Sequence, residues 1–83
     1  MNKPTGNEQG FQHALVYARH QAGVSQEALA AIAGLDRSFV SLLERGQRTP
    51  TLKTIFLLAE ALDISATELV RLTEHFGARN SKG

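Results

Sequence analysis

The sequence predicts an all-α fold of five short helices in one small domain. Apolar residues recur at helical spacing in five separate stretches of the 83-residue chain. Residues that cap helices or turn the backbone, such as Ser25, Gly34 and Ser65, stand between these stretches. The chain has no cysteine, which excludes a disulfide framework and a thiolate metal site. So small a core is marginally stable unless its helices pack well or a partner subunit completes it, so size alone favours dimerisation.

The chain divides by composition into an arm, a domain and a tail. We expect residues 1–6 to form a flexible N-terminal arm and residues 77–83 a flexible polar C-terminal tail that begins at Gly77. The domain then spans residues 7–76, and its first helix begins near Asn7. The apolar stripe predicted for this helix is Phe11, Leu15, Ala18 and Ala22.

Residues 25–45 are interpreted as two short helices joined by a turn of about three residues. Ser25 is a good N-cap for the first of these helices, and Gly34 can end it in the left-handed conformation. Asp36 is then placed to cap the second helix. The residues expected to let the helices cross closely and to fill the space beneath are Ala30, Val40 and Leu43. This arrangement is a helix-turn-helix.

Two further helices follow a loop at residues 45–50. Pro50 stops the chain from continuing as helix, and Thr51 caps the fourth helix. A turn at residues 63–64 leads to Ser65 and Glu68, which form a capping box for the fifth helix. The predicted apolar face of the fourth helix is Leu52, Ile55, Phe56, Leu58, Ala59 and Leu62. That of the fifth helix is Leu69, Leu72 and Phe76.

Residues 11–72 resemble the Xre-type helix-turn-helix proteins, a family similar to phage repressors and Cro. The residues that carry this resemblance are Gln26, Leu29, Ala30, Gly34, Val40, Leu43, Glu44, Gly46, Arg48, Pro50, Leu52, Leu58, Ala59, Leu62 and Leu69. The resemblance implies a phage-repressor-like fold and a transcriptional regulator of a bacterium or phage that binds double-stranded DNA. It also implies that Arg19 pairs with Glu44. Residues 35–41 and 44–46 look especially like the small controller proteins of restriction-modification systems.

A helix-turn-helix places its second helix in the major groove of DNA. The face opposite to Val40 and Leu43 carries the candidate base-reading residues Arg37, Ser38, Ser41 and Leu42. Arg37 is the strongest of these, because a guanidinium matches the two acceptors of guanine. Leu42 either touches thymine methyl groups or is plain surface. Phe39 either extends the core or leans on the sugar-phosphate backbone.

Basic charge gathers on the same part of the chain. Residues 36–53 contain four basic and two acidic residues, whereas residues 54–76 contain four acidic residues and one basic residue. The amino ends of the second and fourth helices offer amide groups to phosphate. The candidate phosphate-binding residues are Gln26, Arg45, Gln47, Arg48, Thr51 and Lys53. The alternative is a solvated loop that happens to be basic.

Specific recognition by so small a domain usually needs two copies on a palindromic site. We therefore expect a homodimer, whose candidate interface residues are Leu57, Val70, Leu72 and Phe76. Leu57 is the strongest of these candidates, because it is an apolar residue that lies off the main apolar stripe of its helix. Each of these side chains can also be ordinary exposed surface.

A protein-interaction module and an enzyme are the two alternative classes of function. A protein-interaction module, such as an antitoxin-like or anti-repressor subunit, would use the same fold, but Arg37 and the basic loop argue against it. The residues that could serve in an active site already have structural tasks: Ser25, Asp36 and Ser65 are placed as caps, and Glu44 belongs to the ion pair that the resemblance implies. We therefore expect no enzyme, no cofactor and no small-molecule ligand. The histidines lie too far apart to predict a metal site: His13, His20 and His75. Neither a membrane span nor a secretory signal is expected, which favours the cytoplasm.

Overall fold

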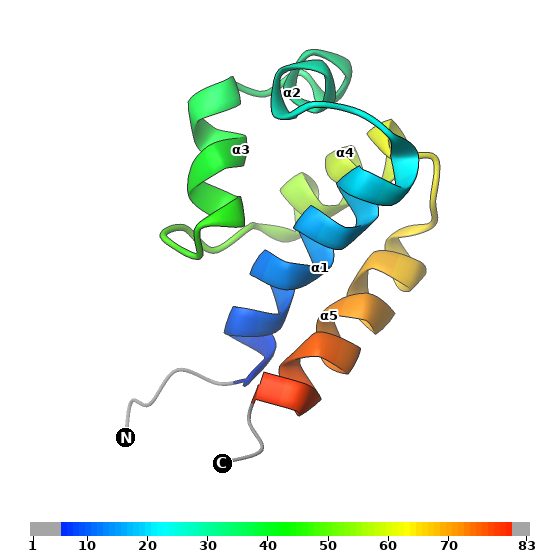
Figure 1. Ribbon diagram of the computed structural model, residues 1–83. Helices are drawn as coiled ribbons and strands as arrows, with labels where there is room; N and C mark the ends of the chain where they lie inside the picture. The colour runs from blue at the N-terminus through cyan, green and yellow to red at the C-terminus, as the bar shows by residue number, and fades with distance from the viewer. Residues whose placement is uncertain (1–5, 81–83) are drawn as a thin grey trace.

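The computed structural model describes residues 6–80, which form five helices and no strand (Figure 1). In chain order they are α1 (Gly6–Ala22), α2 (Gln26–Ala33), α3 (Arg37–Glu44), α4 (Leu52–Ala61) and α5 (Ala66–Asn80). The all-α, five-helix expectation is confirmed. The flexibility expected of residues 1–5 and 81–83 concerns positions outside the described residues.

The core draws at least one large side chain from every helix. Leucines at helical spacing converge on the centre because burying their apolar surface is the main force available to so short a chain. The largest fully buried side chains are Leu15, Leu29, Val40, Leu43, Leu58 and Leu69. The N-terminal stripe differs from the prediction at one position, since Ala22 is exposed at the end of α1 and Ala14 is buried instead.

Helices α1 and α5 run antiparallel and lie side by side along their length (Figure 1). Their backbones meet at Gly10 and Gly77, both buried. A Cβ atom at Gly10 would lie 2.6 Å from the amide nitrogen of Gly77 and against the carbonyl of Thr73. The expected start of a tail at Gly77 is therefore wrong: α5 continues to Asn80, because a glycine here allows the two helices to approach closely.

Helix α4 buries a narrower face than its sequence predicts. Leu58, Ala59 and Leu62 lie in the core, but Leu52 is 68% exposed and Phe56 is 56% exposed. The helix packs against α2 and α5, and these neighbours cover only one stripe of its surface. Two large apolar side chains are left at the surface.

The turn between α4 and α5 follows the sequence prediction, while the capping box forms only in part. Asp63 adopts a left-handed φ of 60°, and Ser65 accepts a hydrogen bond of 3.0 Å from the Glu68 amide. The Glu68 carboxylate turns to Arg71 instead of to the Ser65 amide and accepts hydrogen bonds of 2.9 and 2.8 Å. These bonds, with the positive charge behind them, lower the pKa of Glu68 from its ordinary value of 4.5.

Candidate nucleic-acid interface

The turn between α2 and α3 has the geometry that its sequence predicts. Ser25 caps α2 by accepting from the Ala28 amide at 3.0 Å. Gly34 takes a φ of 74°, and the amide of Leu35 donates to the Ala30 carbonyl at 2.9 Å. This left-handed ending directs the chain at once into α3 (Figure 1). Asp36 stands at the N-cap position of α3, but its side chain makes no capping hydrogen bond.

Helix α3 has one buried side and one side open to solvent. Val40 and Leu43 are fully buried against the rest of the domain. The outward side carries all four candidate base-reading residues, with Arg37 and Ser38 exposed and Ser41 and Leu42 half-buried. The guanidinium of Arg37 therefore stands at the start of the helix, accessible from solvent. Such a helix can present donors and a methyl-sized apolar contact to the edges of bases.

A buried ion pair fixes the end of α3 to α1, as the family resemblance implied. Arg19 donates from Nε and Nη2 to the Glu44 carboxylate at 2.6 and 3.0 Å, and from Nη1 to the Val24 carbonyl at 2.9 Å. The hydrogen bonds to Glu44 raise the pKa of Arg19, although burial opposes this shift. Glu44 is only 8% exposed. The pair thus sets the angle between α1 and the helix that carries Arg37.

Gln26 belongs to the same network, which the sequence did not indicate. Its Nε2 atom donates to Oε1 of Glu44 at 2.9 Å, so the side chain expected to bind phosphate is held from within the protein. An amide nitrogen carries two protons, and this bond uses one of them. The structure therefore leaves Gln26 one N–H group, together with the backbone amides at the start of α2, for an outside acceptor.

The amino end of α4 offers a second set of backbone amides. The Thr51 hydroxyl accepts from the Thr54 amide at 3.1 Å and lies 3.0 Å from the Thr54 hydroxyl. Thr51 therefore acts first as a cap, and the backbone of this turn is what can meet a phosphate. Lys53 is exposed in the first turn of the helix. From the sequence, Thr51 was expected both to cap α4 and to bind phosphate.

The loop between α3 and α4 carries the remaining basic side chains. Arg45, Gln47 and Arg48 are all exposed. Gly46 takes a φ of 72°, and the chain then folds back beside α3. The guanidinium carbon of Arg48 lies 5.9 Å from the centre of the Phe39 ring. Phe39 is half-buried and packs against the core, so it extends the core on one side and meets Arg48 on another.

The four residues expected at a dimer interface occupy different environments. Val70 is 41% exposed, whereas Leu57 and Phe76 are half-buried. Leu72 is only 8% exposed and belongs to the core. Its assignment to a dimer interface is wrong, because the α1–α5 contact already covers it. The sequence missed Leu52 and Phe56, whose exposure depends on where α4 packs and has no local signature.

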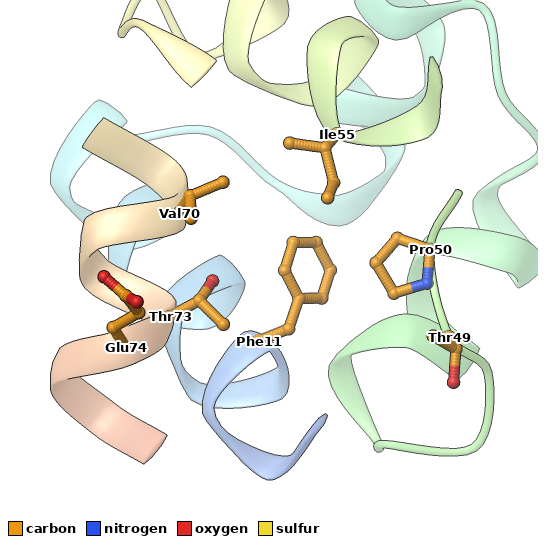
Figure 2. Close-up of a pocket in the computed structure, with 7 residues that line it drawn as sticks. All are labelled: Phe11, Thr49, Pro50, Ile55, Val70, Thr73 and Glu74. Carbon is orange, nitrogen blue, oxygen red and sulfur yellow. The ribbon is translucent and has the colours of Figure 1, made fainter. Parts of the chain in front are cut away.

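A pocket of about 270 Å³ lies beside these side chains. It is lined by Phe11, Thr49, Pro50, Ile55, Val70, Thr73 and Glu74. Figure 2 shows the Phe11 ring between Val70 on one side and Pro50 on the other, with Ile55 facing it. A shallow groove lined in part by Leu52, Ile55, Phe56 and Val70 adjoins it. We call Leu52, Ile55, Phe56 and Val70 the α4–α5 apolar face.

No three histidine, aspartate or glutamate side chains of residues 6–80 gather into a group that could hold a metal ion. None of the helices in the same range combines the length and the apolar character that crossing a bilayer demands.

Comparisons with known proteins agree with this geometry. A family model described as helix-turn-helix matches residues 15–69. The chain is 43% identical over 63 residues to y4dJ, an uncharacterized HTH-type transcriptional regulator of Sinorhizobium fredii, covering 74% of this chain and 82% of the relative. It is 42% identical over 65 residues to the control protein C.SmaI of Serratia marcescens, covering 78% and 74% of the two chains. The crystal structure of the restriction-modification controller protein C.AhdI from Aeromonas hydrophila is similar, with a TM-score of 0.70 and 50% sequence identity over 72% of this chain and 91% of that one.

Proposed function

Because the chain belongs to the helix-turn-helix family of DNA-binding transcriptional regulators, we propose that it binds a palindromic operator as a homodimer, with α3 in the major groove. The observation that carries this proposal is the two-sided character of α3. Val40 and Leu43 on its inner side are fully buried, and Arg37 and Ser38 stand exposed at its amino end. The early residues of such a helix are those that reach base edges in a major groove.

Base reading is assigned to Arg37 above all. Its guanidinium can donate two hydrogen bonds to O6 and N7 of one guanine. Ser38 and Ser41 can donate to a base or a phosphate, and Leu42 offers apolar contact to a thymine methyl group. Each good bidentate contact discriminates against the wrong base by about 1–3 kcal/mol, so loss of Arg37 is expected to relax the operator preference at one position of each half-site.

Phosphate contacts are assigned to groups that flank α3. The backbone amides at the starts of α2 and α4 provide fixed donors, and Gln26 adds its remaining N–H group. Arg45, Gln47, Arg48 and Lys53 are exposed beside them. These contacts fix the register of the protein on DNA and release counterions without reading sequence.

The α4–α5 apolar face is proposed to meet the same face of a second copy. Leu52, Phe56 and Val70 are the exposed large apolar side chains of α4 and α5. The face adjoins the pocket at Phe11, which offers room for an apolar side chain from the partner. An isologous contact of this kind makes a two-fold dimer, and a two-fold dimer matches a palindromic operator.

We assign the chain to the controller-protein subgroup and to the bacterial cytoplasm, where operator DNA is found. The support is its 50% identity to C.AhdI and 42% identity to C.SmaI, named as a controller and a control protein respectively. A regulator of this kind needs no catalytic group, and the buried carboxylate of the described residues, Glu44, is already engaged by Arg19 and Gln26. We therefore propose binding alone as its activity.

The proposal is tested by selecting duplexes from a random pool at near-physiological salt. Wild type is expected to enrich a palindromic consensus, and Arg37→Ala is expected to lose a guanine preference in each half-site while keeping the rest. Arg45→Ala is the matched comparison, because Arg45 is an exposed arginine assigned to phosphate. It is expected to weaken binding to all duplexes alike and to keep the guanine preference. Enrichment of nothing by wild type would overturn the function and favour a protein-interaction module with the same fold.

A further inference from the structure

We propose that Phe39 is a positioning residue that holds the guanidinium of Arg48 ready for a DNA phosphate, at the edge of α3 opposite to Arg37. This inference rests on the proposed function. It assigns a task to the one half-buried aromatic side chain of α3, whose place the sequence left open. It also separates Arg48 from the other basic side chains of its loop.

The loop after α3 has a fixed course that brings Arg48 back to the helix. The amide of Gln47 donates to the Leu42 carbonyl at 2.9 Å, and the amide of Gly46 donates to the Leu43 carbonyl at 3.1 Å. With Gly46 at a φ of 72°, these two bonds form a Schellman ending. The chain therefore reverses within the loop, and Arg48 lies alongside α3 instead of pointing away from the domain.

The Phe39 ring is a firm platform for Arg48. Its side chain is half-buried and packs against the core, which limits its rotamers. The Cζ atom of Arg48 lies 5.9 Å from the ring centre, within the distance at which a guanidinium is attracted by the electrons of an aromatic face. Arg48 is itself exposed, so its N–H groups stay accessible to an outside acceptor. Arg45, which directly follows α3, has no such ring contact among the described residues.

Helical geometry places the two arginines on opposite edges of the groove-facing surface. At 3.6 residues per turn, Arg37 and Phe39 project to the two sides of a face whose middle carries Ser38 and Leu42. The guanidinium of Arg48 follows the Phe39 edge. In a major groove the first residues of a recognition helix, Arg37 among them, reach base edges, whereas groups that lie beside the helix approach the phosphates of the groove walls. Arg48 thus stands where a phosphate contact is expected.

Holding Arg48 in place before DNA arrives lowers the cost of binding. A free arginine side chain has many rotamers, and an interface must order it on contact. A cation–π contact at an exposed site corresponds to an effect of about two- to fivefold on binding. We therefore expect a small but measurable change on removal of the ring, and we expect it only when Arg48 is present.

A double-mutant cycle on the selected operator tests this dependence. The variants are Phe39→Leu, Arg48→Ala and their combination, measured as Kd at fixed salt and as the slope of affinity against salt. Phe39→Leu keeps apolar volume for the core and removes the ring. We expect it to weaken binding about two- to fivefold in the wild-type background and to have little further effect in the Arg48→Ala background. Arg48→Ala is expected to reduce the salt slope by about one.

Two comparisons keep a structural role apart from a positioning role. Phe39→Tyr retains an aromatic face and is expected to restore wild-type affinity. In the matched control cycle with Arg45→Ala, the effects of Phe39→Leu and Arg45→Ala are expected to multiply. Independent effects of Phe39→Leu and Arg48→Ala, or equal coupling to Arg45 and Arg48, would overturn the inference while wild-type operator binding kept the proposed function intact. A wild type without operator preference would overturn both.

Discussion

At the scale of single residues, the candidate interface is braced from within by a carboxylate that accepts three hydrogen bonds from two residues. Glu44 accepts from Nε and Nη2 of Arg19 and from Nε2 of Gln26. The pair is shielded, with side-chain exposures of 13% for Arg19 and 5% for Glu44. A shielded pair fixes geometry more reliably than it adds net stability. Its value here is that it connects α1 and the start of α2 to the end of α3.

Removal of this carboxylate should destabilise the domain clearly. Glu44→Ala leaves the Arg19 guanidinium partly buried without its counter-charge, so we expect the free energy of unfolding to fall by about 3 kcal/mol. Urea denaturation followed by circular dichroism measures this change. Glu68→Ala, which breaks the exposed pair with Arg71, is the control and should have little effect. Equal losses in both variants would contradict the bracing role of Glu44.

Gly34 allows the helix-turn-helix to turn as sharply as it does. Its φ of 74° is in a region that side chains with a Cβ rarely adopt. Gly34→Ala is expected to lower the free energy of unfolding by about 1–2 kcal/mol, although a Cβ there would meet no neighbouring atom. Gly34→Asn should lose less, because asparagine tolerates this conformation. Thermal denaturation of the two variants measures the difference, and a larger loss for asparagine would show that strain at φ is not the cause.

At the scale of secondary-structure elements, the α1–α5 contact determines how close two backbones come. Gly10 and Gly77 are both buried where the helices cross. The contact also covers Leu72 and Ala18. Two antiparallel helices at this distance form a rigid support, on which the rest of the domain packs.

A single methyl group should disturb this support. In Gly10→Ala the new Cβ meets the Thr73 carbonyl and the backbone of Gly77, none of which can move without shifting a helix. We expect a destabilisation of about 1–3 kcal/mol, read from the midpoint of urea unfolding. Gln9→Ala is the control, since Gln9 is exposed on the same helix. If Gly10→Ala were as stable as wild type, the close approach of α1 and α5 would not be essential.

At the scale of the whole molecule, the two surfaces of interest lie on different elements. The candidate DNA-binding surface is built from α2, α3, the loop between α3 and α4, and the first turn of α4. The α4–α5 apolar face lies on α4 and α5. Helix α4 belongs to both, because its first turn offers amides and its outer side carries Leu52 and Phe56. Dimerisation and DNA binding would therefore share one rigid element.

Charge placed on the apolar face should separate two copies of the chain. Phe56→Glu puts a carboxylate where an apolar contact is proposed, so we expect it to sediment as a monomer at tens of micromolar and to bind the operator more weakly. Ile32→Glu is the matched control, because Ile32 is an equally exposed apolar residue on α2. It should leave the sedimentation of the free protein unchanged. A wild type that sediments only as a monomer would contradict the dimer.

The sequence by itself determined the number of helices, their order and the helix-turn-helix. Caps such as Ser25 and Thr51 and left-handed endings such as Gly34 act on the nearest few residues, and apolar spacing marks the side that each helix buries. These signals are local, so they can be read along the chain. The accessible face of α3 followed from them, because Val40 and Leu43 already belonged to the core.

Only the tertiary structure decided which side chains meet across elements. The bond from Gln26 to Glu44, the place of Arg48 over Phe39 and the burial of Leu72 each join residues that are distant in sequence or depend on how two helices approach. The exposure of Phe56 likewise depends on how α4 lies against its neighbours. Helical periodicity tells which side of a helix is apolar, but the neighbouring helices decide how much of that side they cover.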